Sequence, residues 1–295
     1  MTDQAARRYA FTHVDVFTQE RFGGNQLAVF TDARGLADGE MQAIATEMNF
    51  AESTFVFPPA DPSNDAAVRI FTPARELPFA GHPTVGTGFV LGSLRGKTAV
   101  TLELGVGPIA VAVDAGGATM DQPLPAFRGT PATRDELAAL VSLPAWDIHP
   151  DLPAEFGTAG VEFLYLPLRS HEAVARARGD AEALVRFFGQ SAHPAVYLFT
   201  TETVTPGAAA HARMLSLLLS ADVREDPATG SAAGPFGGYL VRHGVRPAGQ
   251  FAVEQGYEMG RPSIIDVTVD APGGQVARVR VGGGVVRVTE GTLFI

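Results

Sequence analysis

The spacing of apolar and polar residues in the first third of the chain predicts several short strands and a helix. HVDVFT (13–18) and NQLAVFTD (25–32) alternate enough to form two strands of a hairpin-like unit. ESTFVF (52–57) and AAVRIFTP (66–73) are further expected strands, each limited by proline. Between the strands expected at 25–32 and 52–57, DGEMQAIATEMN (38–49) places its apolar residues on one face of a helix.

The second half of the chain repeats this mixture of strands and helices. RDELAALVSL (134–143) predicts a helix, with Thr133 as its capping residue. Strands are expected at 161–168 and 195–202, and a helix is expected between them at about 172–188.

A proline-rich stretch, DQPLPAFRGTPAT (121–133), loses this periodicity and marks the boundary between two domains. We therefore expect an N-terminal lobe of residues 1–124 and a C-terminal lobe of residues 125–282. The final strand-like segment, VVRVTEGTLFI, is suited to complete a sheet in either lobe. We assign residues from about 283 to 295 to the N-terminal lobe.

One motif occurs twice in the chain. RELPFAGH (75–82) and REDPATGS (224–231) share Arg, Glu, Pro and Gly at a constant offset of 149 residues (224 − 75), about half of the 295-residue chain. Small residues and then an apolar stretch follow each copy. The repeat predicts two related half-domains, each with a glycine turn that opens a helix.

Composition and charge limit the partners of the protein. A hydrophobic fraction of 46% and a charged fraction of 18% are typical of a soluble globular protein with a large core. The net charge of −10 argues against nucleic acid and anionic membranes as partners. The sequence has no 18-residue apolar run and no apolar signal region at its start, which favours a cytoplasmic location.

The residue counts also exclude several kinds of chemistry. With no cysteine, the chain has neither disulfides nor thiolate catalysis. Lys97, the one lysine, lies in a polar loop, which disfavours a Schiff-base mechanism because such a mechanism needs a buried amine. No HxH or HExxH spacing occurs, so a metal site is not expected.

The two glycine turns are candidate anion sites. Backbone N–H groups at the start of a helix have no partner within the helix, and the helix dipole favours a negative charge there. Gly81, Thr229 and Gly230 are therefore candidate residues for binding a substrate carboxylate. Two ordinary helix caps are the alternative.

Three side chains are candidates for acid–base chemistry. Glu52 opens an apolar strand, where loss of water contact raises a carboxyl pKa; an exposed loop glutamate is the alternative. His82 lies in the first turn of its helix and is expected to be neutral, because the helix dipole disfavours its cation. Asp226 is either an acid or a residue that forms the turn before Pro227.

The longest motifs, RIFTPARELPFAGHPTVGT and REDPATGSAAGP, together with FGGNQLAVF, resemble the phenazine-biosynthesis isomerase family, the PhzF-like proteins. On this resemblance, the catalytic glutamate of the family falls on Glu52 and its GHP histidine on His82. The aspartate and serine of its DPATGS motif fall on Asp226 and Ser231. Gln26 departs from the family, which usually has proline at this position.

The resemblance implies an α+β fold that is shared with diaminopimelate epimerase and proline racemase. Two pseudo-symmetric lobes, each a curved mixed sheet wrapped around a central helix, would enclose an active site in the cleft between them. Cysteine racemases of this fold use one thiol from each lobe. That mechanism is excluded here because the chain has no cysteine.

The function that the resemblance implies is a cofactor-independent isomerase of a small unsaturated or cyclic carboxylic acid. The best-known family reaction is the isomerisation of trans-2,3-dihydro-3-hydroxyanthranilate. Glu52 would move the proton, while His82, Asp226 and Ser231 would orient the substrate and relay protons. An epimerase or dehydratase of another small amino or hydroxy acid, and a non-catalytic metabolite-binding protein, are the alternatives. A homodimer is expected from the resemblance.

Overall fold

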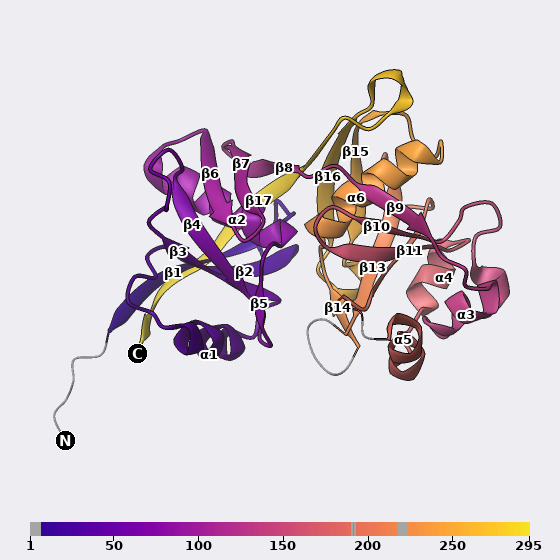
Figure 1. The fold of residues 1–295 in the computed structure, drawn as a ribbon, viewed down its shortest axis with the longest axis horizontal. Helices are drawn as coiled ribbons and strands as arrows, with labels where there is room; N and C mark the ends of the chain where they lie inside the picture. Colours follow the sequence, from indigo (N-terminus) through magenta and orange to yellow (C-terminus); the bar gives the residue numbers. More distant parts are fainter. Residues whose placement is uncertain (1–6, 190, 192, 218–222) are drawn as a thin grey trace. The chain divides into compact units, whose positions relative to one another are not determined.

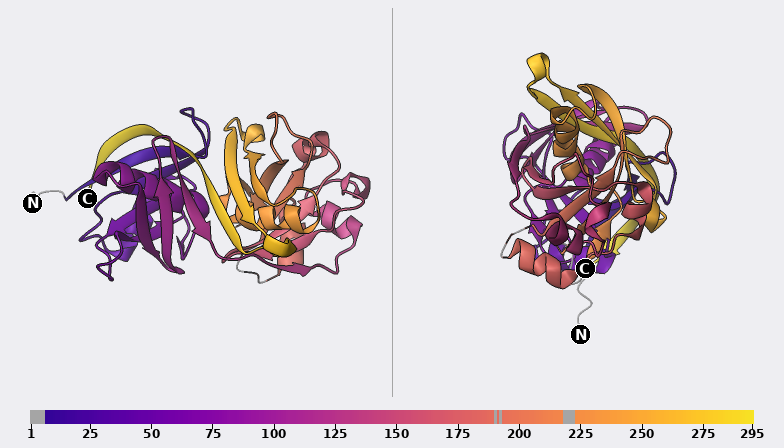
Figure 2. Two further views of the ribbon diagram at one scale, coloured as in Figure 1. Left: turned by 90° about the horizontal axis from the view of Figure 1, so that it is seen from above. Right: turned by 90° about the vertical axis from the view of Figure 1, so that its right-hand side faces the viewer.

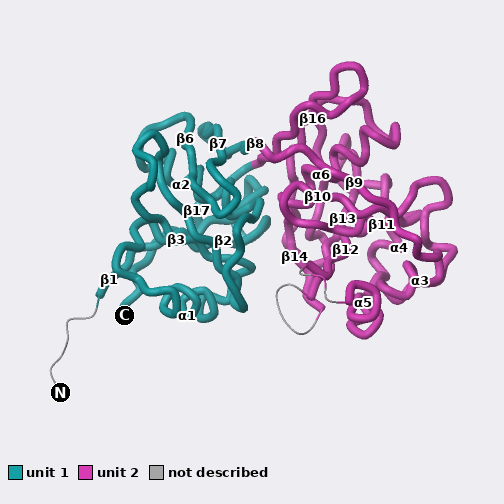
Figure 3. Tube along the Cα trace, in the orientation of Figure 1, with its two compact units in different colours: residues 1–120, 284–295 teal, residues 121–283 magenta. Residues whose placement is uncertain are grey.

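The computed structural model describes residues 7–189, 191, 193–217 and 223–295 and divides the chain into two compact units. Unit 1 comprises Met1–Met120 and Gly284–Ile295, and unit 2 comprises Asp121–Gly283 (Figures 1 and 3). The chain passes from one unit to the other twice, once within strand β8 (Gly117–Gln122) and once within strand β17 (Arg278–Phe294).

Unit 1 contains seven further strands and two helices among its described residues. The strands are β1 (Arg8–Val16), β2 (Asn25–Phe30), β3 (Glu52–Phe57), β4 (Ala66–Phe71), β5 (Glu76–Leu77), β6 (Ala99–Leu104) and β7 (Gly107–Val113). The helices are α1 (Asp38–Met48) and α2 (Gly81–Arg95).

Unit 2 has a similar set of elements. Its strands are β9 (Ala126–Gly129), β10 (Glu155–Thr158), β11 (Glu162–Pro167), β12 (Ala195–Thr200), β13 (Ala210–Ser216), β14 (Arg224–Asp226), β15 (Gly249–Gln255) and β16 (Ser263–Asp270). Its α-helices are α3 (Arg134–Ala139), α4 (His171–Arg176), α5 (Ala181–Phe188) and α6 (Gly230–Arg242). Short 3-10 turns cover Ala145–Asp147, Tyr257–Met259 and Pro272–Gly274.

The two units share one strand topology. The hydrogen-bonded order in unit 1 is β17-β1-β2-β3-β4-β6-β7-β8, with β5 paired to β4. In unit 2 the order is β9-β10-β11-β12-β13-β15-β16-β17, with β14 paired to β13. In both units, neighbouring strands pair antiparallel except at two corresponding positions. The parallel pairs are β2–β3 and β4–β6 in unit 1, and β11–β12 and β13–β15 in unit 2. The expected pair of pseudo-symmetric mixed sheets is confirmed.

Each sheet packs against the helix that follows the repeated motif. Helix α2 contacts β1, β2, β3, β6 and β7, and every residue from Gly81 to Gly92 is buried (Figure 1). A Cβ atom at Gly88 would lie 2.5 Å from Cγ1 of Val111, so glycine allows the helix to approach β7 closely. Helix α6 likewise contacts β10, β11 and β16. The small residues after each motif thus serve the packing of a central helix.

The C-terminal segment completes the sheet of unit 1. Residues of β17 from Val285 to Phe294 pair antiparallel with β1, and the yellow end of β17 runs beside the indigo β1 in Figures 1 and 2. Of the two sheets that the segment was suited to complete, it completes that of unit 1.

One secondary-structure prediction is wrong. The helix expected at about 172–188 is divided into α4 and α5, because the side chain of Asp180 caps a new helix by accepting a hydrogen bond from the Ala183 amide. Within the stretch 121–133, β8 reaches Gln122 and β9 pairs with β10. In contrast, Thr133 caps α3 as expected.

None of the described helices is both long and apolar enough to cross a membrane.

Candidate functional site

In unit 1, the structure places Glu52 and His82 in direct contact. Glu52 begins β3, and His82 is the second residue of α2. The Nε2 atom of His82 lies 3.4 Å from Oε2 of Glu52. Both residues are buried, with 8% of Glu52 and 3% of His82 exposed. The alternative of an exposed loop glutamate is therefore wrong.

Asn25 fixes the orientation of this histidine. It begins β2, the strand that pairs in parallel with β3 and sets Leu27 opposite Glu52. The side-chain amide nitrogen of Asn25 lies 3.0 Å from Nδ1 of His82. With this amide as the donor, Nδ1 accepts a hydrogen bond and the ring proton is on Nε2, which faces the Glu52 carboxylate.

His82 is neutral in this environment. Burial lowers its pKa to about 3, although a backbone hydrogen bond with Gln26 acts in the opposite direction. Neutrality was expected from the helix dipole, but loss of water contact is the main cause. A neutral imidazole next to a carboxylate can donate a hydrogen bond to a neighbouring oxygen through its one N–H group.

In unit 2, the second copy of the motif forms a compact turn around Asp226. Asp226 ends β14 and is 6% exposed. Its Oδ2 atom accepts a hydrogen bond of 2.6 Å from the hydroxyl of Thr229. Ser231 is the second residue of α6 and is half-buried. The motif therefore brings a buried carboxylate to the start of the helix that carries Ser231.

Two glutamines brace this turn. Gln255, the last residue of β15, accepts from the Thr229 amide at 3.1 Å. Its Nε2 donates to the Asp226 carbonyl at 2.7 Å and to the Thr229 hydroxyl at 3.0 Å. Gln122 donates to the Gly230 carbonyl at 2.9 Å. Neither glutamine is predicted from the sequence, because each lies at the end of a strand that is remote from the motif in sequence.

A buried tyrosine lies behind Asp226. The registers of β12, β13 and β14 align Tyr197 with Met214 and Met214 with Asp226. Burial raises the pKa of Tyr197 far above its usual value, and the negative charge of Asp226 raises it further. The phenol therefore keeps its proton, and Asp226 has an apolar, weakly screening environment on this side.

The starts of α2 and α6 correspond to the predicted glycine turns. Helix α2 begins at Gly81 and α6 begins at Gly230. Neither cap residue, Ala80 or Thr229, accepts a helix amide through its side chain, and the Thr229 hydroxyl is directed to Asp226 instead. The first amides of both helices are thus oriented for an anion. The binding role of Gly81, Thr229 and Gly230 stays a prediction.

The Thr229 hydroxyl is expected to contribute measurably to the stability of the turn. Thr229→Val keeps the shape of the side chain but removes the donor to Asp226 and the acceptor for Gln255. We expect a loss of about 1–3 kcal/mol in the free energy of unfolding, because buried polar groups lose their partners. Urea unfolding measures this loss.

The matched control is Thr268→Val, at a half-buried threonine of β16 in the same unit. This substitution should change the free energy of unfolding by no more than about 0.5 kcal/mol. Equal urea midpoints for Thr229→Val and the unsubstituted protein would show that the hydroxyl does not stabilise the turn.

Possible metal ligands occur elsewhere. In the described part of the chain, the histidine and carboxylate groups close enough to share one ion are those of His171, His211 and Glu258 in unit 2. None of these three residues is among those described around Glu52 or around Asp226.

Comparisons with known proteins find a matching family and similar sequences. Residues 14–291 match the family described as phenazine biosynthesis-like protein. An uncharacterised isomerase of Mesorhizobium japonicum is 39% identical and covers 95% of this chain and 97% of its own length. The trans-2,3-dihydro-3-hydroxyanthranilate isomerase of Pseudomonas fluorescens is 36% identical, with coverage of 96% and 98%.

Solved structures show the same fold. A PhzF-family phenazine biosynthesis protein of Bacillus anthracis is similar with a TM-score of 0.85 and 27% identity, over 98% of this chain and 100% of the other. A hydroxyproline epimerase of Agrobacterium vitis has a TM-score of 0.66 at 13% identity, over 98% of this chain and 91% of the other. The second similarity shows the fold alone.

Proposed function

This chain belongs to the phenazine biosynthesis-like, or PhzF, family of isomerases, and we propose that it moves a proton within a small unsaturated or cyclic carboxylic acid. The observation that carries this proposal is the buried contact between Glu52 and His82, 3.4 Å apart, with the histidine ring oriented by Asn25. A carboxylate held beside a neutral imidazole is suited to accept a proton and to return it.

Glu52 is proposed as the acid–base residue. It would take a proton from a carbon that is made acidic by conjugation or by a neighbouring carbonyl. It would then return a proton at another carbon of the same molecule, so the substrate and the product have the same composition. His82 would donate a hydrogen bond to the oxygen on which negative charge develops. Both groups are chemically sufficient for a proton shift without a cofactor.

Asp226 and Ser231 are proposed to orient the substrate and relay protons. The supporting observation is the braced turn, in which Thr229 and Gln255 hold Asp226 at the start of α6. The amides near Gly81 and Gly230 would bind the carboxylate of the substrate.

As the first substrate to test, we propose trans-2,3-dihydro-3-hydroxyanthranilate. The support is the name shared by three Pseudomonas relatives that are 35–36% identical to this chain. For this substrate, isomerisation would move a proton between carbon atoms of the ring.

Incubation of the purified protein with this substrate in deuterated water, followed by NMR, tests the proposal. Conversion with deuterium at a carbon atom supports a proton shift that exchanges with solvent. Loss of water from the substrate would indicate a dehydratase, and inversion of one carbon without a shift of the double bond would indicate an epimerase. If the protein neither converts nor exchanges any acid of this class, the proposed reaction is wrong.

The protein is also proposed to form a homodimer, on the basis of its family resemblance. Light scattering after size-exclusion chromatography distinguishes the 31.0 kDa chain from a particle of twice that mass. A single 31.0 kDa species at all concentrations tested would exclude a stable dimer.

A further inference from the structure

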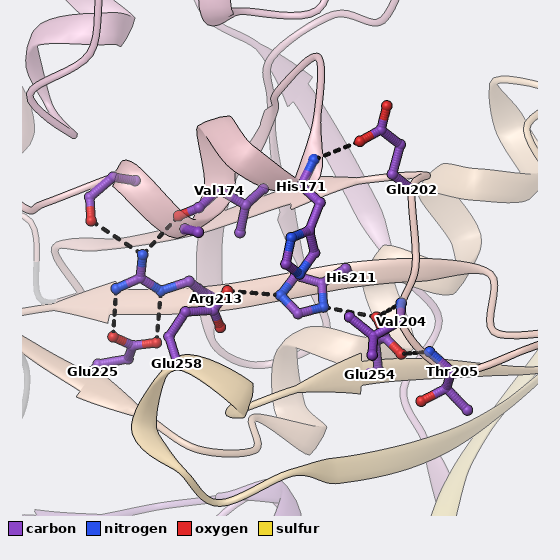
Figure 4. A network of polar contacts seen from close by, with 12 residues as sticks. His171, Val174, Glu202, Val204, Thr205, His211, Arg213, Glu225, Glu254 and Glu258 are labelled. Atoms are coloured by element: carbon purple, nitrogen blue, oxygen red, sulfur yellow. Dashed lines mark hydrogen bonds and ion pairs between the residues drawn. The ribbon is translucent and has the colours of Figure 1, made fainter.

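Two histidines and a glutamate converge in unit 2, outside the residues proposed for the isomerase reaction. His171 begins α4, His211 lies in β13, and Glu258 lies in the 3-10 turn Tyr257–Met259. One ligating atom from each side chain lies within 4.8 Å of the other two. Figure 4 shows the three side chains together with the carboxylate of Glu254.

A second carboxylate fixes the ring of His211. Its Nδ1 atom lies 2.7 Å from Oε1 of Glu254, and both side chains are fully buried. Glu254 is itself held by the backbone amides of Val204 at 2.6 Å and Thr205 at 2.7 Å. A histidine that ligates a metal through one ring nitrogen usually donates its other N–H to such a carboxylate. In this arrangement, Nε2 is the ring nitrogen of His211 that can ligate a metal ion.

The Nε2 atom of His211 is directed at Glu258. It lies 2.9 Å from Oε1 of that residue. Two potential metal ligands, a ring nitrogen and a carboxylate oxygen, therefore lie side by side. The side chain of Glu258 is 15% exposed, which allows an ion to enter from solvent. Glycines at φ +81° (Gly256) and +67° (Gly260) flank the turn that carries Glu258.

His171 provides the third ligand. Its ring packs against the ring of His211, with centroids 4.4 Å apart and planes inclined by 61°. Its Nε2 atom is buried and makes no hydrogen bond with any described residue. A buried ring nitrogen that no described protein group engages, beside a histidine–carboxylate pair, is available to ligate an ion.

The local charges suit a dication, because the carboxylates of Glu254 and Glu258 lie 2.7 and 2.9 Å from the two ring nitrogens of His211. The nearby guanidinium of Arg213 pairs with Glu225 at 2.7 and 2.8 Å.

We propose that unit 2 binds one divalent transition-metal ion, preferentially Zn²⁺, through Nε2 of His171, Nε2 of His211 and the carboxylate of Glu258. Two imidazoles and one carboxylate form a donor set that zinc commonly takes. Glu254 orients His211 but does not ligate the ion.

The ion would link α4, β13 and the turn after β15. That turn follows Gln255, the residue that braces Asp226 and Thr229. The proposed ion is thus structural, and the inference does not rest on the proposed isomerase reaction.

The test uses the full-length protein after removal of metal with a chelator. Calorimetric titration with Zn²⁺ should show one ion per chain, and titration with Co²⁺ should produce the visible absorption of a protein-bound, low-coordinate cobalt ion. At a free zinc concentration about a hundredfold above the dissociation constant, the melting temperature should rise by about 5 °C or more.

His171→Ala is the decisive variant, because it removes a ligand and leaves the hydrogen bonds of His211 with Glu254 and Glu258 in place. It should fold with an unchanged circular dichroism spectrum and bind zinc at least about tenfold more weakly. His149→Ala removes another histidine of unit 2 and should bind zinc as tightly as the unsubstituted protein. The proposal is overturned if the unsubstituted protein binds no stoichiometric Zn²⁺ or Co²⁺, or if His171→Ala binds zinc with unchanged affinity.

Discussion

Glu52→Gln is expected to lower the turnover number for the acid that the protein isomerises by at least about a hundredfold, a typical contribution of general acid–base catalysis. Glutamine has nearly the same shape as glutamate and keeps a hydrogen-bonding oxygen 3.4 Å from His82, but it cannot accept a proton. The substrate should still bind. The loss should therefore appear mainly in kcat, and incorporation of solvent deuterium should fall with it.

Glu47→Gln is the matched control for this experiment. Glu47 is an exposed glutamate of α1, and its substitution removes one negative charge from the same unit. The turnover number of this variant should stay within about twofold of the original value, as expected for a surface substitution. A loss of less than about tenfold in Glu52→Gln would assign the proton transfer to another group.

The stability of unit 1 is expected to depend on pH through His82. Its pKa is about 3 in the folded protein and 6.5 in the unfolded chain, so the unfolded chain binds the additional proton between these values. The stabilising contribution is therefore fully present above pH 6.5 and is lost as the pH falls towards 3. The slope approaches about 1.4 kcal/mol per pH unit within this window.

The measurement is urea unfolding of the unsubstituted protein and of His82→Gln at pH 7.5, 6, 5 and 4. Glutamine does not titrate. Between about pH 6 and 4, the free energy of unfolding of His82→Gln should therefore decrease by about 2–3 kcal/mol less than that of the unsubstituted protein. The comparison of slopes is independent of any constant loss caused by the substitution. Parallel curves for the two proteins would indicate that His82 titrates normally in the folded state.

The repeated motif is the part of the site that the sequence predicts best. The shared Pro and Gly spacing identifies Gly81 and Gly230 as helix starts, because a glycine turn followed by small and apolar residues has one dominant local structure. The strand that begins at Glu52 also follows from a local signal, the run STFVF. Its burial beside His82 does not, since that depends on a helix which begins 29 residues later (81 − 52).

Contacts between strands account for what the sequence cannot predict. Gln255 braces Asp226 only because β13 pairs in antiparallel with β14 and in parallel with β15. His171 and His211 are 40 residues apart (211 − 171), so a search for closely spaced metal ligands does not find them. The break between α4 and α5 has a local signal, the cap Asp180, but the apolar periodicity of the segment masks it.

The route of β17 has a consequence for synthesis on the ribosome. Unit 2 ends at Gly283, whereas the sheet of unit 1 also needs residues from Val285 onward to pair with β1. The unit that is translated first is therefore the one whose sheet is completed last. Until the codons of residues 285–294 are read, β1 has an unpaired edge, which is a site for association with other nascent chains. A stop codon in place of the codon for Gly284 would leave this edge exposed permanently, while every residue of unit 2 would still be present.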